Sequence, residues 1–419
     1  MTRQFANNSC CFLLLVILAL PAIGQTPSVI RRLDGSTITP AHADKIAASE
    51  LTRDHVTGAQ LAILNNGHVV WTYAFGFRDV EHQLPMTTDT DMGAASITKP
   101  VFATWVMRLV EEHRIDLDEP IAKMLSRPLN DYAPYRDSAA DLVRDPQWQL
   151  VTPRMLLSHT SGLGTLLGIE HDHKFHLHFR PGSHYAYSNA GYSLLQFAIE
   201  QKLNLSIARS MQDEIFTPLG MTRTSMVRQP SFAENATLPY DANGNLISRP
   251  SGGSAHRQTD RASAAGSMTT TINDLSRFLT AYLAGKILEP STRTEMLTAQ
   301  LAIHTLHEAP TLSTETGTEG GRVGLSAGLG WVLLTRTRYG LAFSKEGWVA
   351  GVQNFLICFP RSGTCMILLT NSNNGSLAFR PLLEKLIGDN VTPWEWERFT
   401  RKDILQDDEH AHWKYIDRR

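Results

Sequence analysis

The sequence predicts a mixed α/β (α+β) fold, with one antiparallel sheet built from both ends of the chain and flanked by helices. Strand-like apolar stretches gather near the two ends, whereas the middle of the chain is mostly helical in its periodicity, with irregular loops. We therefore expect the sheet to come from about 38–100 and 322–390, with an inserted, mainly helical region at about 101–321.

The first part of the chain carries a helix signal followed by a hairpin signal. Pro40 precedes the helix expected at 41–53, and proline is well tolerated near a helix start. The strands expected at 59–63 and 69–75 flank Asn65-Asn66-Gly67, a strong hairpin signal. An apolar-periodic helix is then expected at 101–112.

The rest of the chain adds further helices and a run of strands. The expected helices are 189–203, 275–284 and 379–387, and the expected strands are 328–336, 341–345, 353–359 and 365–370. Residues 175–179 also alternate like a strand leading to Pro181.

Cys358 and Cys365 flank an expected turn centred on Arg361-Ser362, so they would face each other across two strands. Two interpretations remain open at this point. They form a disulfide in an oxidising compartment, or they are two small buried apolar residues.

The charges are balanced, with 39 Lys and Arg against 41 Asp and Glu and a formal charge of −2. No basic surplus indicates nucleic-acid binding, and no acidic run indicates a disordered tail. The apolar content of 42% fits a globular protein.

Residues 1–24 are typical of a secretory signal peptide. Arg3 supplies positive charge, 12–20 form an apolar core that is short for a bilayer span, and small residues follow Pro21. We expect an exported protein, periplasmic or extracellular, without a stable membrane span after cleavage; an uncleaved anchor helix is the alternative. The folded domain is expected at 25–390, and the tryptophan-containing tail at 391–419 is either docked or partly disordered.

Three short motifs occur once each in the sequence. In chain order they are Ser96-Ile97-Thr98-Lys99, Tyr187-Ser188-Asn189 and Lys345-Glu346-Gly347. They supply a hydroxyl, two amines, a phenol, an amide and a glycine, which is the equipment for acyl transfer through a serine ester. Because positions i and i+3 share a face of a helix, the amine of Lys99 is expected to point toward Ser96.

The motifs resemble those of the serine β-lactamase and penicillin-binding protein superfamily, in the branch with class C β-lactamases, family VIII-type esterases, D-aminopeptidases and DD-peptidases. The resemblance extends over about 38–388 and includes Leu156-Leu157-Ser158-His159-Thr160-Ser161-Gly162-Leu163, Pro181-Gly182 and the small-residue turn at 265–270. The resemblance implies a β-lactamase/transpeptidase-like fold and a small-molecule or peptide-like substrate as the partner. It also implies that the reaction uses no metal or organic cofactor.

The resemblance also implies catalytic roles for three residues. Ser96 is the nucleophile, and Lys99 acts as a base or as a nearby cation. Tyr187 is the general base and later a proton donor, and Lys99 and Lys345 are expected to lower its pKa.

The same resemblance implies four substrate-binding residues. Asn189 binds the substrate amide and Lys99, Lys345 adds positive charge at the edge strand, and Gly347 leaves room for the substrate backbone. The backbone N–H groups of Ser96 and Trp348 form the expected oxyanion hole.

Glu346 departs from the pattern of the superfamily, where a threonine is frequent. Lys345 favours substrates that carry a carboxylate, but Glu346 adds a negative charge and removes a hydroxyl, so an ester, amide or peptide substrate is at least as well supported as a β-lactam.

His159 is expected to hold a turn. A cluster of acidic residues and histidines follows, but its spacing does not match a common zinc signature, and no metal site is predicted there. Its members are Glu170, His171, Asp172, His173, His176 and His178. Specificity is expected to depend on the loops at 130–149 and 302–320.

The sequence thus predicts a secreted serine hydrolase that acts through a Ser96 acyl-enzyme on an ester, amide, peptide or β-lactam bond. The first alternative is a penicillin-binding or sensor-type protein that acylates with little turnover, and the second is an inactive structural relative.

Overall fold

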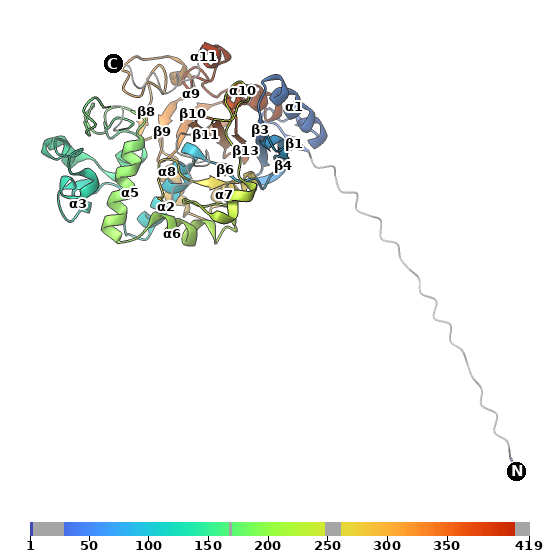
Figure 1. Ribbon diagram of the computed structural model, residues 1–419, viewed down its shortest axis with the longest axis horizontal. Helices are drawn as coiled ribbons and strands as arrows, with labels where there is room; N and C mark the ends of the chain where they lie inside the picture. The colour runs from blue at the N-terminus through green and yellow to red at the C-terminus, as the bar shows by residue number, and fades with distance from the viewer. Residues whose placement is uncertain (3–28, 167–169, 248–260, 407–419) are drawn as a thin grey trace.

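The structure, a computed structural model, describes residues 1–2, 29–166, 170–247 and 261–406 (Figure 1). Nearly all of the expected signal peptide lies outside the described residues, as do Trp413 and the end of the tail.

One sheet of nine strands organises the fold, and every pair of neighbouring strands in it is antiparallel. In spatial order the strands are β5 (Leu84–Pro85), β4 (His68–Asp79), β3 (Gly58–Asn65), β13 (Thr364–Thr370), β12 (Val352–Phe359), β11 (Gly340–Val349), β10 (Val332–Thr337), β9 (Leu325–Ala327) and β8 (Leu301–Ala302). The N-terminal hairpin joins the C-terminal strands where β3 pairs with β13, for example Leu61 opposite Leu368. The predicted fold class is confirmed.

Both faces of the sheet are covered, because successive side chains of a strand point to opposite faces. On β3, Leu61 and Ile63 pack with α1 (Pro40–Arg53) and α10 (Gly375–Leu386). Ala62 and Leu64 belong to a second apolar cluster that includes α2 (Thr98–Glu111) and α7 (Ile272–Leu283). Figure 1 shows α1 and α10 side by side at one edge of the molecule.

The inserted region is mainly helical, as predicted, and most of it lies on the α2 side of the sheet. Besides α2 and α7 it contains α3 (Ile121–Met124), α4 (Pro153–Leu157), α5 (Asn189–Leu203), α6 (Ile207–Met211), α8 (Pro290–Met296) and α9 (Glu319–Val323). No helix in the described ranges is long and apolar enough to cross a membrane.

Two strand predictions are corrected by the structure. Residues 328–331 precede β10 rather than belong to it, and Gly330 there has a φ of +85°, outside the strand region. Residues 175–179 form no strand; a single bridge joins Leu177 to Leu163, because this alternating stretch has no extended partner.

Cys358 and Cys365 lie directly opposite each other on β12 and β13, with Cα atoms 4.1 Å apart, and they form a disulfide. Both are buried. The structure therefore selects the first of the two interpretations that the sequence left open.

The described part of the tail packs on the body of the protein. Trp394, Trp396 and Phe399 are buried in the cluster formed with α1 and α10. The indole N–H of Trp396 donates to Thr305 Oγ1 at 3.1 Å, and its carbonyl accepts from the N–H of Glu308 at 2.9 Å. A last helix, α11 (Arg401–Gln406), follows. These contacts join the tail to the loop between β8 and α9.

Replacing Trp396 by alanine is expected to lower the free energy of unfolding by about 3–5 kcal/mol, because a large buried side chain is lost and a cavity remains. Urea denaturation followed by circular dichroism measures this. Glu395→Ala is the control at an exposed neighbouring position and should change stability by less than about 0.5 kcal/mol. Equal stability of the two variants would show that the tail does not pack on the body in solution.

Candidate active site

The Ser96 turn is held in a strained conformation at the start of α2. Ser96 lies in a 3₁₀ turn, Ala95–Ile97, and Ala95 adopts a φ of +48°, which is unfavourable for a residue with a side chain. The strand β6 (Met92–Gly93) just before the turn pairs with β7 (Thr269–Thr270), and the N–H of Ala94 donates to the carbonyl of Met268 at 2.8 Å. These backbone contacts fix the position of Ser96 from both sides.

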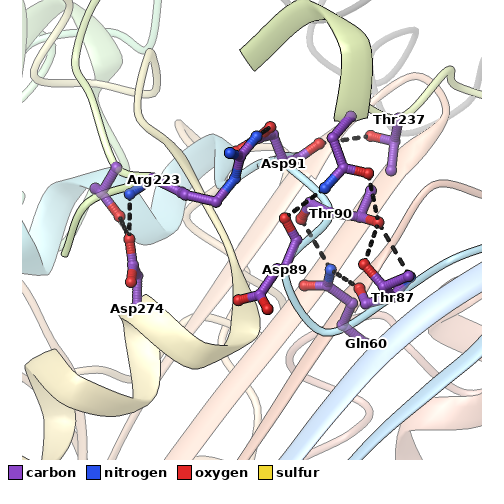
Figure 2. Close-up of polar contacts among 10 residues, drawn as sticks. Gln60, Thr87, Asp89, Thr90, Asp91, Arg223, Thr237 and Asp274 are labelled. Atoms are coloured by element: carbon purple, nitrogen blue, oxygen red, sulfur yellow. Dashed lines mark hydrogen bonds and ion pairs between the residues drawn. The ribbon is translucent and has the colours of Figure 1, made fainter. Parts of the chain in front are cut away.

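A buried polar network holds the segment that leads into this turn (Figure 2). The side-chain amide of Gln60 on β3 donates to the carbonyls of Thr87 and Thr90 at 2.5 and 2.8 Å. The carboxylate of Asp91 accepts from Nε of Arg223 at 3.0 Å, and the backbone N–H of Arg223 donates to Asp274 on α7 at 2.8 Å. The segment is thereby tied to the sheet and to the helical region at once.

Lys99 lies one helical turn after Ser96, as predicted, and it is fully buried. Its Nζ is 3.0 Å from Ser96 Oγ, 2.7 Å from Asn189 Oδ1 and 2.6 Å from the carbonyl oxygen of Ala265. Burial, and then repulsion by Lys345, hold the pKa of Lys99 well below its ordinary value. A neutral amine has two N–H groups and one lone pair, which match two oxygen acceptors and the Ser96 hydroxyl.

Tyr187 contacts Ser96 as well, with its hydroxyl 2.6 Å from Ser96 Oγ. The Nζ atoms of Lys99 and Lys345 lie 4.8 and 4.7 Å from the centre of its ring. The expected lowering of its pKa is wrong. Lys345 does act in that direction, but burial has the larger effect and the pKa of Tyr187 is raised. The resting side chain is therefore a phenol that can donate to Ser96 Oγ.

His159 supports this arrangement from behind, in the structural position that the sequence indicated. Its Nδ1 accepts the N–H of Ser188 at 3.0 Å, and its ring packs on that of Tyr187 with centres 4.5 Å apart. Burial lowers the pKa of His159, so it stays a neutral acceptor. Ser188 in turn caps α5 by accepting the N–H of Gly191 at 2.9 Å, which places Asn189 at the start of the helix.

The third motif lies on β11, which passes against the Ser96 turn. A Cβ on Gly347 would lie 2.5 Å from the carbonyl oxygen of Ala94, so a glycine is needed here for close packing of the strand. Its contact with a substrate, and the oxyanion hole at the N–H groups of Ser96 and Trp348, remain predictions.

Lys345 is buried and in contact with the carboxylate of Glu346. Burial alone would lower the pKa of Lys345, but Glu346 and its other neighbours raise it above the ordinary value, so the side chain is a cation. Its charge is already balanced by Glu346, which weakens the expectation that Lys345 receives a substrate carboxylate.

A cavity of about 90 Å³ lies beside Ser96. It is lined by Ser96, Thr165, Tyr187, Asn189, Glu308, Ala309, Thr311, Glu346, Trp348, Glu397 and Phe399. The sequence analysis missed Glu308 and Glu397. The only signal for them was that Glu308 falls in a loop named as a specificity element and that Glu397 ends a tryptophan-containing run.

We call Glu308, Glu346 and Glu397 the carboxylate cluster; one carboxylate oxygen of each lies within 4.8 Å of the other two. Glu308 accepts the hydroxyl of Tyr185 at 2.7 Å. Burial, together with the charge of Glu346, raises the pKa of Glu308 to about 7 and that of Glu397 well above its ordinary value.

The histidines at 171–178 do not form a comparable group. Nε2 of His176 lies 3.0 Å from the carboxylate of Asp172, and Nε2 of His178 lies 2.8 Å from that of Glu170. Each of these two histidines thus has one acidic partner. In the described ranges, the carboxylate cluster is the group in which three His, Cys, Asp or Glu side chains lie close enough together to hold a metal ion.

Comparison with known proteins identifies the family. The Beta-lactamase family model matches residues 43–388, so the chain belongs to the beta-lactamase family. Protein flp of Staphylococcus aureus strain N315 is 24% identical over 230 residues, which are 49% of this chain and 43% of that protein. The D-aminopeptidase of Brucella anthropi is 27% identical over 186 residues, 43% of this chain and 35% of that enzyme. This chain therefore spans less than half the length of these curated relatives.

The fold is also shared with solved structures. The octameric penicillin-binding protein homologue from Pyrococcus abyssi superposes with a TM-score of 0.65 at 22% identity, over 85% of this chain and 79% of that one. At this identity the likeness concerns the fold.

The carboxylate cluster is expected to cost stability at high pH. The pKa of Glu397 is raised well above its ordinary value of 4.5 in the folded protein, so above pH 4.5 unfolding releases protons and stability falls as pH rises. Glu397→Gln, which resembles the protonated form, should melt about 1–3 °C above the wild type at pH 8, with a smaller difference at pH 5. Scanning calorimetry at both pH values tests this, and a Glu397→Gln variant that melts lower at pH 8 would contradict it.

Proposed function

We propose that this member of the beta-lactamase family is an exported serine hydrolase that cleaves an ester, amide or peptide bond through an acyl-enzyme on Ser96. The observation that carries the proposal is the position of Ser96 Oγ between Lys99 Nζ at 3.0 Å and Tyr187 Oη at 2.6 Å. One neighbour can take a proton and the other can give one.

In acylation, Ser96 Oγ attacks the substrate carbonyl while its proton passes to the lone pair of Lys99. Lys99 suits this step because its pKa is lowered by burial, and because Asn189 and Ala265 accept the N–H groups of the amine and so orient it. The negative charge on the carbonyl oxygen is received by the N–H groups of Ser96 and Trp348.

Tyr187 serves the leaving group. Its pKa is raised by burial, so it enters the reaction protonated and can protonate the departing oxygen or nitrogen as the tetrahedral intermediate collapses. The tyrosinate that forms lies beside the ring-facing ammonium groups of Lys99 and Lys345, which stabilise it. Water then attacks the ester of Ser96, with the proton transfers reversed.

Two further observations support the rest of the proposal. The disulfide between Cys358 and Cys365 is typical of an oxidising compartment and agrees with export through a signal peptide at 1–24. The pairing of Lys345 with Glu346 leaves the site poorly suited to a carboxylate, so penicillins are not the favoured substrates. The domain at 25–390 carries the motifs, and the tail adds Glu397 to the cavity wall.

The proposal predicts a covalent intermediate on Ser96. Intact-protein mass spectrometry is followed over time after mixing with 4-nitrophenyl acetate and, separately, with a penicillin. An acetyl adduct should appear and decay with the ester, and Ser96→Ala should show none and lose essentially all turnover. An adduct that persists with the penicillin, without ester turnover, would replace this proposal by the penicillin-binding alternative. Full activity of Ser96→Ala would overturn both.

The separate roles of Lys99 and Tyr187 predict different dependences on the leaving group. Lys99→Met should lower kcat/KM by about 10²–10⁴ with every substrate, because the base for acylation is gone. Tyr187→Phe should have a much smaller effect on a 4-nitrophenyl ester, whose leaving group departs without a proton, than on the matching ethyl ester. Equal losses of Tyr187→Phe on both esters would contradict the assignment of Tyr187 as proton donor.

A further inference from the structure

The carboxylate cluster contains buried oxygen atoms that have no hydrogen-bond partner among the described residues. The side chains come from three distant segments: the loop before α9, strand β11 and the tail. Glu346 is 7% exposed and Glu397 is 4% exposed, and Oε2 of each has no hydrogen-bond partner among the described residues. Burying a carboxylate oxygen without a hydrogen-bond partner is costly, and here two such oxygens lie in the wall of one cavity, where an incoming hydrogen-bond donor could satisfy them.

The position of the cluster restricts what that donor can be. Glu308, Glu346 and Glu397 line the same cavity as Ser96, Tyr187 and Asn189. A group bound by the cluster is therefore close to the carbonyl that Ser96 attacks. Whatever supplies the donor is expected to be part of the substrate.

We propose that the carboxylate cluster binds the primary ammonium group of the substrate, so that the preferred acyl donors are esters, amides or peptides of amino acids with a free amine. This inference rests on the proposed acyl-enzyme function and narrows its substrate class. An ammonium group has three N–H donors and no acceptor, which matches three carboxylates that converge within 4.8 Å.

The protonation of the empty cluster agrees with this occupant. Mutual repulsion and burial leave protons on Glu397 and partly on Glu308, since the pKa values of both are raised. When a substrate ammonium group binds, these protons are released to solvent and the carboxyl groups ionise. The carboxylates then accept charge-assisted hydrogen bonds from the ammonium group, which are stronger than hydrogen bonds between neutral groups.

A divalent cation fits the cluster less well. The ammonium of Lys345 is already in contact with Glu346, and a doubly charged ion beside it would meet about twice the repulsion that a substrate ammonium meets. Anionic substrates are disfavoured by the same cluster, which agrees with the weak case for a substrate carboxylate.

The test compares the 4-nitrophenyl ester of alanine, in both enantiomers, with 4-nitrophenyl propionate, which lacks only the amine. Each rate is corrected with Ser96→Ala as the blank, and the ratio of kcat/KM for the amine-bearing ester to that for propionate is measured. Wild-type protein should prefer at least one alanine ester, and Glu397→Gln should lower that ratio about 10- to 100-fold, because a charged hydrogen-bond partner is lost.

Glu395→Gln is the matched control, because it removes the same charge two residues away at an exposed position of the same tail. Its ratio should equal that of the wild type. Circular dichroism and the melting temperature establish that both variants are folded.

The outcomes separate this inference from the function on which it rests. Ser96-dependent cleavage of propionate with no preference for either alanine ester, or an unchanged ratio in Glu397→Gln, overturns the ammonium site and leaves the hydrolase intact. A ratio that falls on dialysis against EDTA and returns with Ca²⁺ or Mg²⁺ overturns it in favour of a metal site. Absence of Ser96-dependent cleavage of all three esters overturns both proposals.

Discussion

The burial of the Lys99 amine is the constraint on which the rest of the site depends. A buried ammonium without partners is strongly unfavourable, so the amine is held by an oxygen from α5, an oxygen from the segment at 265 and the hydroxyl of Ser96. Those three segments are far apart in the chain, and each is fixed separately: α5 by the Ser188 cap, the 265–270 segment by pairing of β7 with β6, and Ser96 by the network around Asp91. The catalytic geometry is thus a consequence of how the helical region closes on the sheet.

The site also has to balance several charges away from water. Lys345 is paired with Glu346, whereas burial lowers the pKa of Lys99 and raises the pKa values of Glu308 and Glu397. These shifts reduce the charge that the buried site carries, and they bring an amine, a phenol and carboxyl groups with raised pKa values close together. Groups that can accept a proton and groups that can donate one therefore lie together around Ser96.

Local patterns made much of this predictable. The i, i+3 spacing in Ser96-Ile97-Thr98-Lys99 places the amine beside the hydroxyl whatever the rest of the fold does, and the turn between Cys358 and Cys365 sets their register. The carboxylate cluster was not predictable, because Glu308 and Glu397 come from irregular segments whose approach depends on the docking of Trp396. The predicted direction of the pKa shift of Tyr187 was wrong for a related reason. Sequence shows the neighbouring charges, but burial, which outweighs them, is a property of the folded chain.

The contacts that Glu346 makes become clear only in the structure. In the sequence it is a departure that removes a hydroxyl from the third motif; in the fold it balances Lys345 and forms one side of an acidic wall that the tail completes with Glu397. The residue between Lys345 and Gly347 therefore changes two features of the cavity at once. It neutralises a lysine that would otherwise attract a carboxylate, and with Glu308 and Glu397 it makes the cavity wall acidic, while Ser96 keeps its contacts with Lys99 and Tyr187.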